Sequence, residues 1–127
     1  HTENPLDKIH AIVNIDELQQ LICESNEVEV DRSIYEYTTE LTQATREHPM
    51  VQLGVSPRGA LAVCRMAKAH AFLEGRNYMI PEDIAAVFGD VCCHRIVLGT
   101  KARMMEEKPE NIIKSVLESV KMPVIKK

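Results

Sequence analysis

The chain has 127 residues, of which 45% are hydrophobic and 27% are charged, and its formal net charge is −4. This length predicts one domain that buries about two-thirds of the surface its unfolded form would expose. The acidic balance argues against a general nucleic-acid binder, which shows a basic excess. No apolar run approaches the roughly 18 residues of a membrane span, and no signal peptide is recognisable.

Cysteine and histidine usage predicts neither a disulfide framework nor a metal site. The four cysteines contain no CxxC pair, and most of them occupy apolar positions of predicted helices, which favours buried, reduced thiols. The five histidines are too scattered along the chain for a metal-binding motif. Reduced thiols indicate a reducing compartment, so we expect the protein in the cytoplasm.

The chain begins with a predicted extended lead-in and a short helix. Residues 1–13 read as extended because Asn4 precedes a proline and Ile9–Val13 has strand character. Asn14 and Glu17 have the spacing of a capping box, which starts the helix. Its apolar residues, which we expect to be buried, are Ile15, Leu18, Leu21 and Ile22.

A second helix is predicted from Asp31, a favourable N-cap residue, to His48 and Pro49. Before it, the alternating segment Glu27–Val30 reads as an isolated extended piece. A loop over residues 49–55 follows the helix. The apolar face of this helix recurs at helical spacing and consists of Ile34, Tyr37, Leu41 and Ala44.

Ser56, Pro57 and Gly75 delimit a third, central helix. The Ser56 hydroxyl can cap the first turn, Pro57 suits the first helical position, and Gly75 suits the left-handed residue that commonly ends a helix. Because the cap occupies its hydroxyl, Ser56 is not expected to be a catalytic nucleophile. Almost all other positions are apolar or small, so we expect this helix in the middle of the domain.

Three arginines form a stripe on the central helix, since Arg65 and Arg76 fall within about 20° of Arg58 on a helical wheel. One interpretation pairs these arginines with carboxylates of neighbouring helices. The other has Arg58, in the first turn beside free backbone amides, reach a phosphate. The wheel alone favours the first interpretation but leaves both open.

The rest of the chain predicts two further helices. Pro81 starts a helix with acidic residues in its first turn. The extended segments Tyr78–Ile80 and Ile96–Leu98 are expected to pair as a small hairpin. Residues 99–108 read as an exposed, mobile linker, and residues 109–127 as a C-terminal helix and tail. The fold class is therefore all-α: one domain, a small bundle of about four to five helices with short extended linkers.

No motif for stand-alone catalysis is present, since the chain lacks GxxxxGK[ST], GxGxxG, HExxH and GxSxG sequences. It does contain a series of sequence words in a recognisable order: Asn4-Pro5-Leu6-Asp7, Ala44-Thr45-Arg46-Glu47-His48-Pro49, Leu53-Gly54-Val55-Ser56-Pro57-Arg58, Gly75-Arg76 with Tyr78-Met79-Ile80-Pro81-Glu82-Asp83-Ile84, and His94-Arg95-Ile96-Val97-Leu98. Over most of the chain, this series resembles the C-terminal lid domain of the MoxR family of AAA+ ATPases. The combination is specific, although each word alone is weak.

The resemblance implies a lid that follows a P-loop core domain, which this chain lacks, and closes over ATP. Mg²⁺ would be held by the core, so this chain by itself is not expected to hydrolyse ATP or to bind a cofactor. Arg58 is similar to the sensor 2 arginine, which approaches the γ-phosphate. For Arg65 and Arg76, structural pairing remains the expectation.

Further site residues follow from the same resemblance. Ser56, Pro57 and Gly59 surround Arg58 in the nucleotide-binding motif, although the family often has alanine where this chain has Gly59. From their motif positions, Tyr37 and Arg46 are also expected to face the nucleotide.

The resemblance also implies partners for the whole protein. These are its own core domain, other copies in a homo-oligomeric ring, expected to be a hexamer, and proteins with von Willebrand factor A domains; its activity would be chaperone-like remodelling. An alternative is an autonomous helical module that binds protein or DNA without nucleotide. The acidic balance and the missing initiating methionine weigh against that alternative, and the chain reads as a fragment of something longer.

Overall fold

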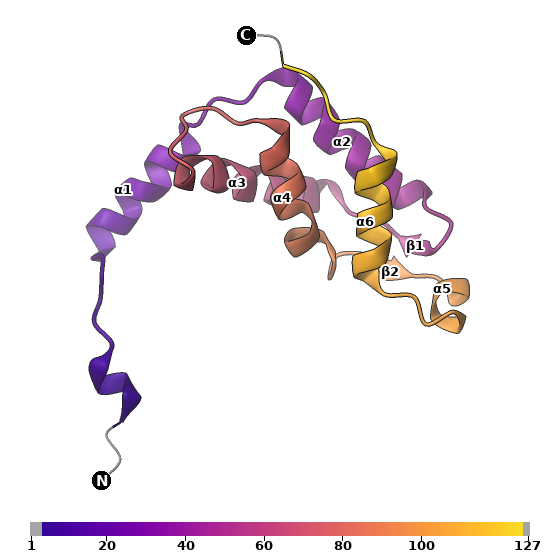
Figure 1. Cartoon of the computed structure of the whole chain (residues 1–127), viewed down its shortest axis with the longest axis horizontal. Coiled ribbons are helices and arrows are strands. Elements are labelled where there is room, and N and C mark those ends of the chain that lie inside the picture. The colour runs from indigo at the N-terminus through magenta and orange to yellow at the C-terminus, as the bar shows by residue number, and fades with distance from the viewer. Residues whose placement is uncertain (1–3, 126–127) are drawn as a thin grey trace.

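The computed structural model describes residues 4–125 (Figure 1). It confirms the predicted all-α class and adds a two-stranded sheet, a 3₁₀ turn and a short fifth helix to what was expected. The elements in chain order are a 3₁₀ turn η1 (Pro5–Lys8), α1 (Ile15–Asn26), α2 (Arg32–Glu47), β1 (Val51–Leu53), α3 (Pro57–Leu73), α4 (Pro81–Cys92), β2 (Val97–Leu98), α5 (Thr100–Met104) and α6 (Pro109–Ser119).

The core lies where α3 and α4 pack on each other and on α2, while α6 packs against α2 and α4. Phe88, Ile34 and Leu41 are fully buried there. The central helix α3 contributes one face, with a buried small or branched residue at every fourth position: Gly59, Val63, Ala67 and Ala71. Its other faces remain open, and Leu61, Met66 and Leu73 are exposed. The prediction of a helix in the middle of the domain is confirmed, since α3 packs against α1, α2 and α4, but small residues form its buried face and larger ones remain exposed.

The sheet pairs different segments from those expected. β1 and β2 are antiparallel, and Gly99 N donates to Met50 O across 2.8 Å beside them. The predicted loop over 49–55 therefore contains a strand. The predicted hairpin between Tyr78–Ile80 and Ile96–Leu98 was wrong, because Tyr78 instead forms a parallel bridge with Glu29. That bridge uses Glu29 of the predicted extended segment Glu27–Val30, although Glu27 itself has helical backbone angles and ends α1.

The N-terminal part does not join the core. Figure 1 shows α1 at the edge of the bundle and the segment before it projecting away. The capping box of Asn14 and Glu17 forms as predicted, but α1 has no buried residue. Residues 5–8 form η1, and Ile9–Val13 forms no strand; residues 1–3 of the predicted lead-in lie outside the described part. The apolar residues of α1, predicted to be buried, are exposed: Ile15 73%, Leu18 48%, Leu21 40% and Ile22 51%.

The predicted linker over residues 99–108 is mostly exposed, as expected, but it is not featureless. It holds the short helix α5, whose Ala102 is fully buried. The cysteines of the described residues are all free, with Cys92 buried and Cys23 exposed. Burial raises the pKa of the Cys92 thiol to about 12, so it stays protonated. Among residues 4–125, no helix combines the length and apolar character that a bilayer span needs.

Candidate functional site

The first turn of α3 has the geometry that its sequence predicts. Ser56 is the N-cap with extended backbone angles, φ −76° and ψ 164°, and its Oγ accepts a hydrogen bond from Gly59 N at 3.2 Å. Ala60 N donates to Ser56 O at 3.0 Å, and Pro57 occupies the first helical position. The hydroxyl of Ser56 therefore serves as a cap, which places Arg58 in the first turn.

The segment before this turn is clamped to the end of α2. Val55 N donates to Thr45 Oγ1 at 3.0 Å, and Arg46 Nε donates to Val55 O at 3.1 Å. Gly54 permits the close crossing, because a Cβ atom there would lie 2.7 Å from the Cα and N of Arg46. The sequence words over residues 44–49 and 53–58, separate in the sequence, are thus joined in one structural unit.

A cleft of about 550 Å³ opens beside this unit, lined by Arg46, Leu53, Gly54, Val55, Ser56, Pro57 and Arg95. Its charged lining residues are two arginines, and no carboxylate lines it. Each guanidinium is anchored through Nε to a backbone carbonyl, Arg46 to Val55 O and Arg95 to Val91 O, both at 3.1 Å. These hydrogen bonds fix the position of both side chains. One outer nitrogen of Arg46 also lies 3.4 Å from the side-chain oxygen of Gln43.

Arg95 is a residue of this cleft that sequence reasoning missed. The His94-Arg95 word marked the position, but nothing in the spacing indicated that the chain returns from α4 to the start of α3. The segment after α4 and the first turn of α3 approach each other at Gly59. A Cβ added there would lie 2.6 Å from Val55 Cγ1 and 3.4 Å from Arg95 Cδ. Glycine is the residue that fits without a shift, which accounts for the departure from alanine at this position.

The other predicted site residues separate into two groups. Arg58 is exposed, and none of the described residues forms an ion pair with it. Tyr37 is only 3% exposed and belongs to the core, and it is absent from the cleft lining. Burial, and then the nearby Glu82 carboxylate, raise the pKa of the Tyr37 phenol. The structure therefore brings Arg46, Ser56 and Pro57 together in the cleft lining. Arg58 and Gly59 follow Pro57 in the first turn of α3 but do not line the cleft, and Tyr37 lies in the core.

Arg76 has the structural partner that was predicted for it. Its two terminal nitrogens each lie 2.7 Å from an oxygen of Asp83, a carboxylate that is fully buried. His70 Nδ1 lies 2.6 Å from Asp83 Oδ1, and Ile80 N donates to Asp83 Oδ2 at 2.8 Å. This network ties α3 to the start of α4. Arg65 is exposed and forms no ion pair within residues 4–125, so the prediction holds for Arg76 alone.

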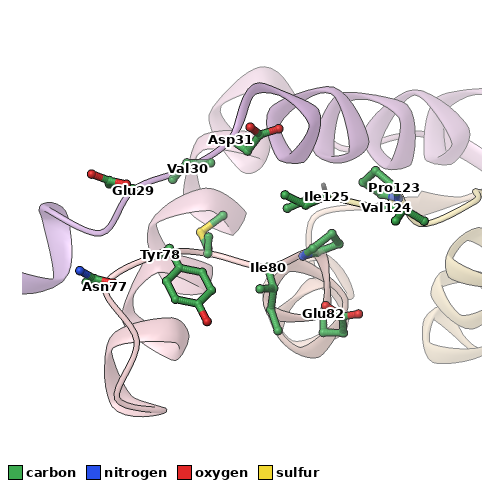
Figure 2. Close-up of a pocket in the computed structure, with 12 residues that line it drawn as sticks. Glu29, Val30, Asp31, Asn77, Tyr78, Ile80, Glu82, Pro123, Val124 and Ile125 are labelled. Carbon is green, nitrogen blue, oxygen red and sulfur yellow. The ribbon is translucent and has the colours of Figure 1, made fainter. Parts of the chain in front are cut away.

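A larger cleft lies elsewhere. It measures about 840 Å³ and is bordered by residues 29–31, 77–82 and 123–125 (Figure 2). Its charged lining residues are all carboxylates: Glu29, Asp31 and Glu82. A phosphate would be repelled there, so electrostatics favours the smaller cleft at the start of α3 as the anion-facing site. No group of His, Cys, Asp or Glu within residues 4–125 is arranged to hold a metal ion.

Comparison with known proteins identifies the family. Residues 43–116, more than half of the chain, match the model described as the AAA lid domain. The chain belongs to the AAA lid domain family. The matched span of this lid includes the clamp between Thr45, Arg46 and Val55, the first turn of α3, and most of α6.

The chain is also similar to individual proteins and to a solved structure. The chain is 37% identical over 121 residues to the uncharacterized protein YeaC of Bacillus subtilis, covering 95% of this chain and 38% of YeaC. It is 33% identical over 105 residues to the chaperone MoxR1 of Mycobacterium tuberculosis, covering 76% of this chain and 28% of MoxR1. A crystal structure of a candidate ATPase from Cytophaga hutchinsonii superposes with a TM-score of 0.75 at 32% identity, covering 85% of this chain and 34% of that protein.

These matches confirm the predicted resemblance to the lid of MoxR-family AAA+ ATPases. The lid spans only about a third of the length of the relatives it matches.

Proposed function

We propose that this lid closes over ATP bound by a P-loop domain outside the chain, and that Arg58 is the sensor 2 residue that contacts the γ-phosphate. The observation that carries the proposal is the exposed Arg58, which forms no ion pair within residues 4–125 and directly follows Pro57, a lining residue of a cleft whose charged groups are Arg46 and Arg95. A triphosphate carries several negative charges, and a carboxylate-free surface with anchored guanidinium groups suits it.

The chemistry asked of this chain is electrostatic. Phosphoryl transfer to water is accelerated by positioning and by stabilising the charge that spreads over the γ-phosphate oxygens. A guanidinium supplies two parallel N–H donors for such oxygens. Ser56, Pro57 and Gly59 would hold the turn that aims Arg58, and Arg46 would hold Val55 in place behind it. The Mg²⁺ that accompanies ATP would be bound by the P-loop domain.

The same contact would couple the nucleotide to movement. Loss of the γ-phosphate would release Arg58, and the packed α2, α3, α4 and α6 would then rotate as a body relative to the P-loop domain. In a homo-oligomeric ring, expected to be a hexamer, that rotation would displace neighbouring subunits and remodel a bound client, with proteins containing von Willebrand factor A domains as partners. We place this activity in the cytoplasm.

The test uses the full-length protein that contains both the P-loop domain and this lid. Arg58→Ala should lower the ATP turnover by about tenfold to a thousandfold, because a positive group at the transition-state phosphate is lost. Arg65→Ala is the matched control: Arg65 is an exposed arginine of the same helix, and the expected turnover is near that of the wild type. Equal turnover in the two variants would remove Arg58 from the mechanism. The isolated lid should hydrolyse no ATP.

A further inference from the structure

The groove shown in Figure 2 is built from three extended segments that converge at one side of the bundle. Residues 29–31 precede α2, residues 77–80 precede α4, and residues 123–125 follow α6. The first two are joined by backbone hydrogen bonds: Glu29 N donates to Asn77 O at 2.9 Å, and Met79 N donates to Glu29 O at 2.8 Å. We call this cleft of about 840 Å³ the acidic groove; it shares no lining residue with the cleft at the start of α3.

The floor of the acidic groove is apolar and partly open to solvent. Figure 2 shows the Tyr78 ring and the Ile80 side chain pointing to the same side of their extended segment, as alternation along a strand requires. Tyr78 is 37% exposed and Val124, at the other end of the groove, is 83% exposed. Apolar surface that forms a concavity marks a binding site more often than apolar side chains that are scattered singly.

The rim of the acidic groove is negative. Its charged lining residues are Glu29, Asp31 and Glu82, and no lysine or arginine lines it. Hydrogen bonds from the Ser33 hydroxyl and from Ser33 N lower the pKa of the Asp31 carboxyl, so Asp31 is ionised at neutral pH. Within residues 4–125, Glu29 and Glu82 form no ion pair. Three carboxylates thus border the floor, and a cation beside it is Arg76, whose guanidinium lies 5.9 Å from the centre of the Tyr78 ring without lining the groove.

We propose that the acidic groove binds an extended peptide segment of a partner protein in which apolar side chains alternate with lysine or arginine. Alternation in an extended chain directs every second side chain to the floor and the others to the rim. The apolar side chains would then contact Tyr78, Ile80 and Val124, while the basic ones meet the carboxylates. Extended segments already line the groove, and recognition of an extended peptide beside such segments is a recurring binding mode. The proposal is independent of the nucleotide function, because it uses a different surface.

The test measures binding of labelled peptides to the 127-residue chain by fluorescence anisotropy, with backbone chemical shifts to locate the contact. The probe alternates valine and lysine over six residues, and the comparison peptide replaces each lysine by glutamate. We expect the lysine peptide to bind at least tenfold more tightly and its affinity to fall as salt is raised. Shifts should concentrate at residues 29–31, 77–82 and 123–125.

Two sets of variants make the result decisive. Glu29→Gln combined with Glu82→Gln should weaken the lysine peptide by about threefold to tenfold, as expected for two partly exposed ion pairs. The matched control is Glu40→Gln combined with Glu118→Gln, which removes two exposed carboxylates that do not line the groove. Val124→Asn, which removes apolar surface without changing the charge, tests the floor and should also weaken binding.

Several outcomes would overturn the proposal. Equal affinity for the two peptides, or equal loss in the groove and control variants, would mean that the surface charge as a whole attracts the peptide. Shifts confined to other residues would place the contact elsewhere. A concentration-dependent dimer that Val124→Asn abolishes would make a second copy of this chain the occupant.

Discussion

Replacing Asp83 by asparagine would test whether one buried carboxylate holds α3 and α4 together. The change keeps the shape of the side chain but replaces an acceptor oxygen by an NH₂ donor. Both Asp83 oxygens already face donors: Oδ2 accepts from Arg76 and from Ile80 N, and Oδ1 accepts from Arg76 beside His70 Nδ1. In either orientation, the asparagine NH₂ would meet a donor at less than 3 Å, and Arg76 would lose its counter-charge.

The magnitude follows from the burial of the pair. Removing one partner of a buried ion pair costs about 3–5 kcal/mol. The Arg76 side chain keeps 20% of its surface exposed, so it recovers some hydration, and we expect a loss near the lower end, about 3 kcal/mol. Urea unfolding followed by circular dichroism measures it. With a slope of about 1–3 kcal/mol per M, the midpoint should fall by about 1–3 M.

The control is Glu82→Gln at the neighbouring exposed position, which should change the free energy of unfolding by less than about 0.5 kcal/mol. A double variant that also carries Arg76→Ala should lose less than the sum of the two single losses, because one interaction is removed in both. If Asp83→Asn and Glu82→Gln changed the free energy of unfolding by the same amount, the network around Asp83 would not stabilise the fold and the argument from burial would be refuted.

The same carboxylate predicts how stability depends on pH. Burial alone would raise the pKa of Asp83, but the hydrogen bonds from Arg76, Ile80 and His70 outweigh it, so the pKa in the folded chain lies below its ordinary value. A carboxyl with a depressed folded pKa contributes stability that is fully present above its unfolded pKa, about 4, and is lost as the pH falls through the folded pKa. The difference between wild type and Asp83→Asn should therefore be constant from about pH 5 to pH 7 and shrink below about pH 4. A difference that stayed constant under acid would contradict this account.

Three further predictions concern packing and the contribution of the terminal helices. Gly54→Ala should lower the free energy of unfolding by about 1–3 kcal/mol, because its Cβ would lie 2.7 Å from the Arg46 backbone. The control is Gly89→Ala in α4, which should raise the free energy of unfolding by about 0.4–1 kcal/mol, because the nearest atom that its Cβ would meet is Ile113 Cγ2 at 3.9 Å. If thermal unfolding ranked the two variants in the opposite order, the close contact between Gly54 and Arg46 would be contradicted. Deleting residues 1–26 should lower the free energy of unfolding by no more than about 2 kcal/mol and leave a cooperative transition, because α1 buries no residue. Deleting residues 109–127 should abolish that transition, because Ile112, Ile113 and Val116 of α6 are buried, and a folded product would refute this view of the core.

The helices were predictable because their signals are local. The caps at Asn14, Asp31 and Ser56 and the stop at Gly75, whose φ is +82°, depend on residues within a few positions of each other. The partners of extended segments were not predictable in this way. Pairing of Val51–Leu53 with Val97–Leu98 joins segments more than forty residues apart, and it is decided by how α3 and α4 pack between them. Arg95 was missed as a cleft residue for the same reason.

The apolar face of α1 shows the limit of periodicity as an argument. Periodicity establishes that Ile15, Leu18, Leu21 and Ile22 lie on one side of a helix, and α1 is such a helix. It does not establish what covers that side. Within residues 4–125 these side chains stay exposed by 40% or more, whereas the equivalent positions of α2, Ile34 and Leu41, are fully buried. The two helices cannot be told apart by their own sequences, because burial is decided by contacts between α2, α3, α4 and α6. A lid that spans a third of its relatives' length leaves room for such a surface to meet the rest of the protein, and measuring the exposure of α1 by hydrogen exchange in the isolated lid and in the full-length protein would decide whether it does.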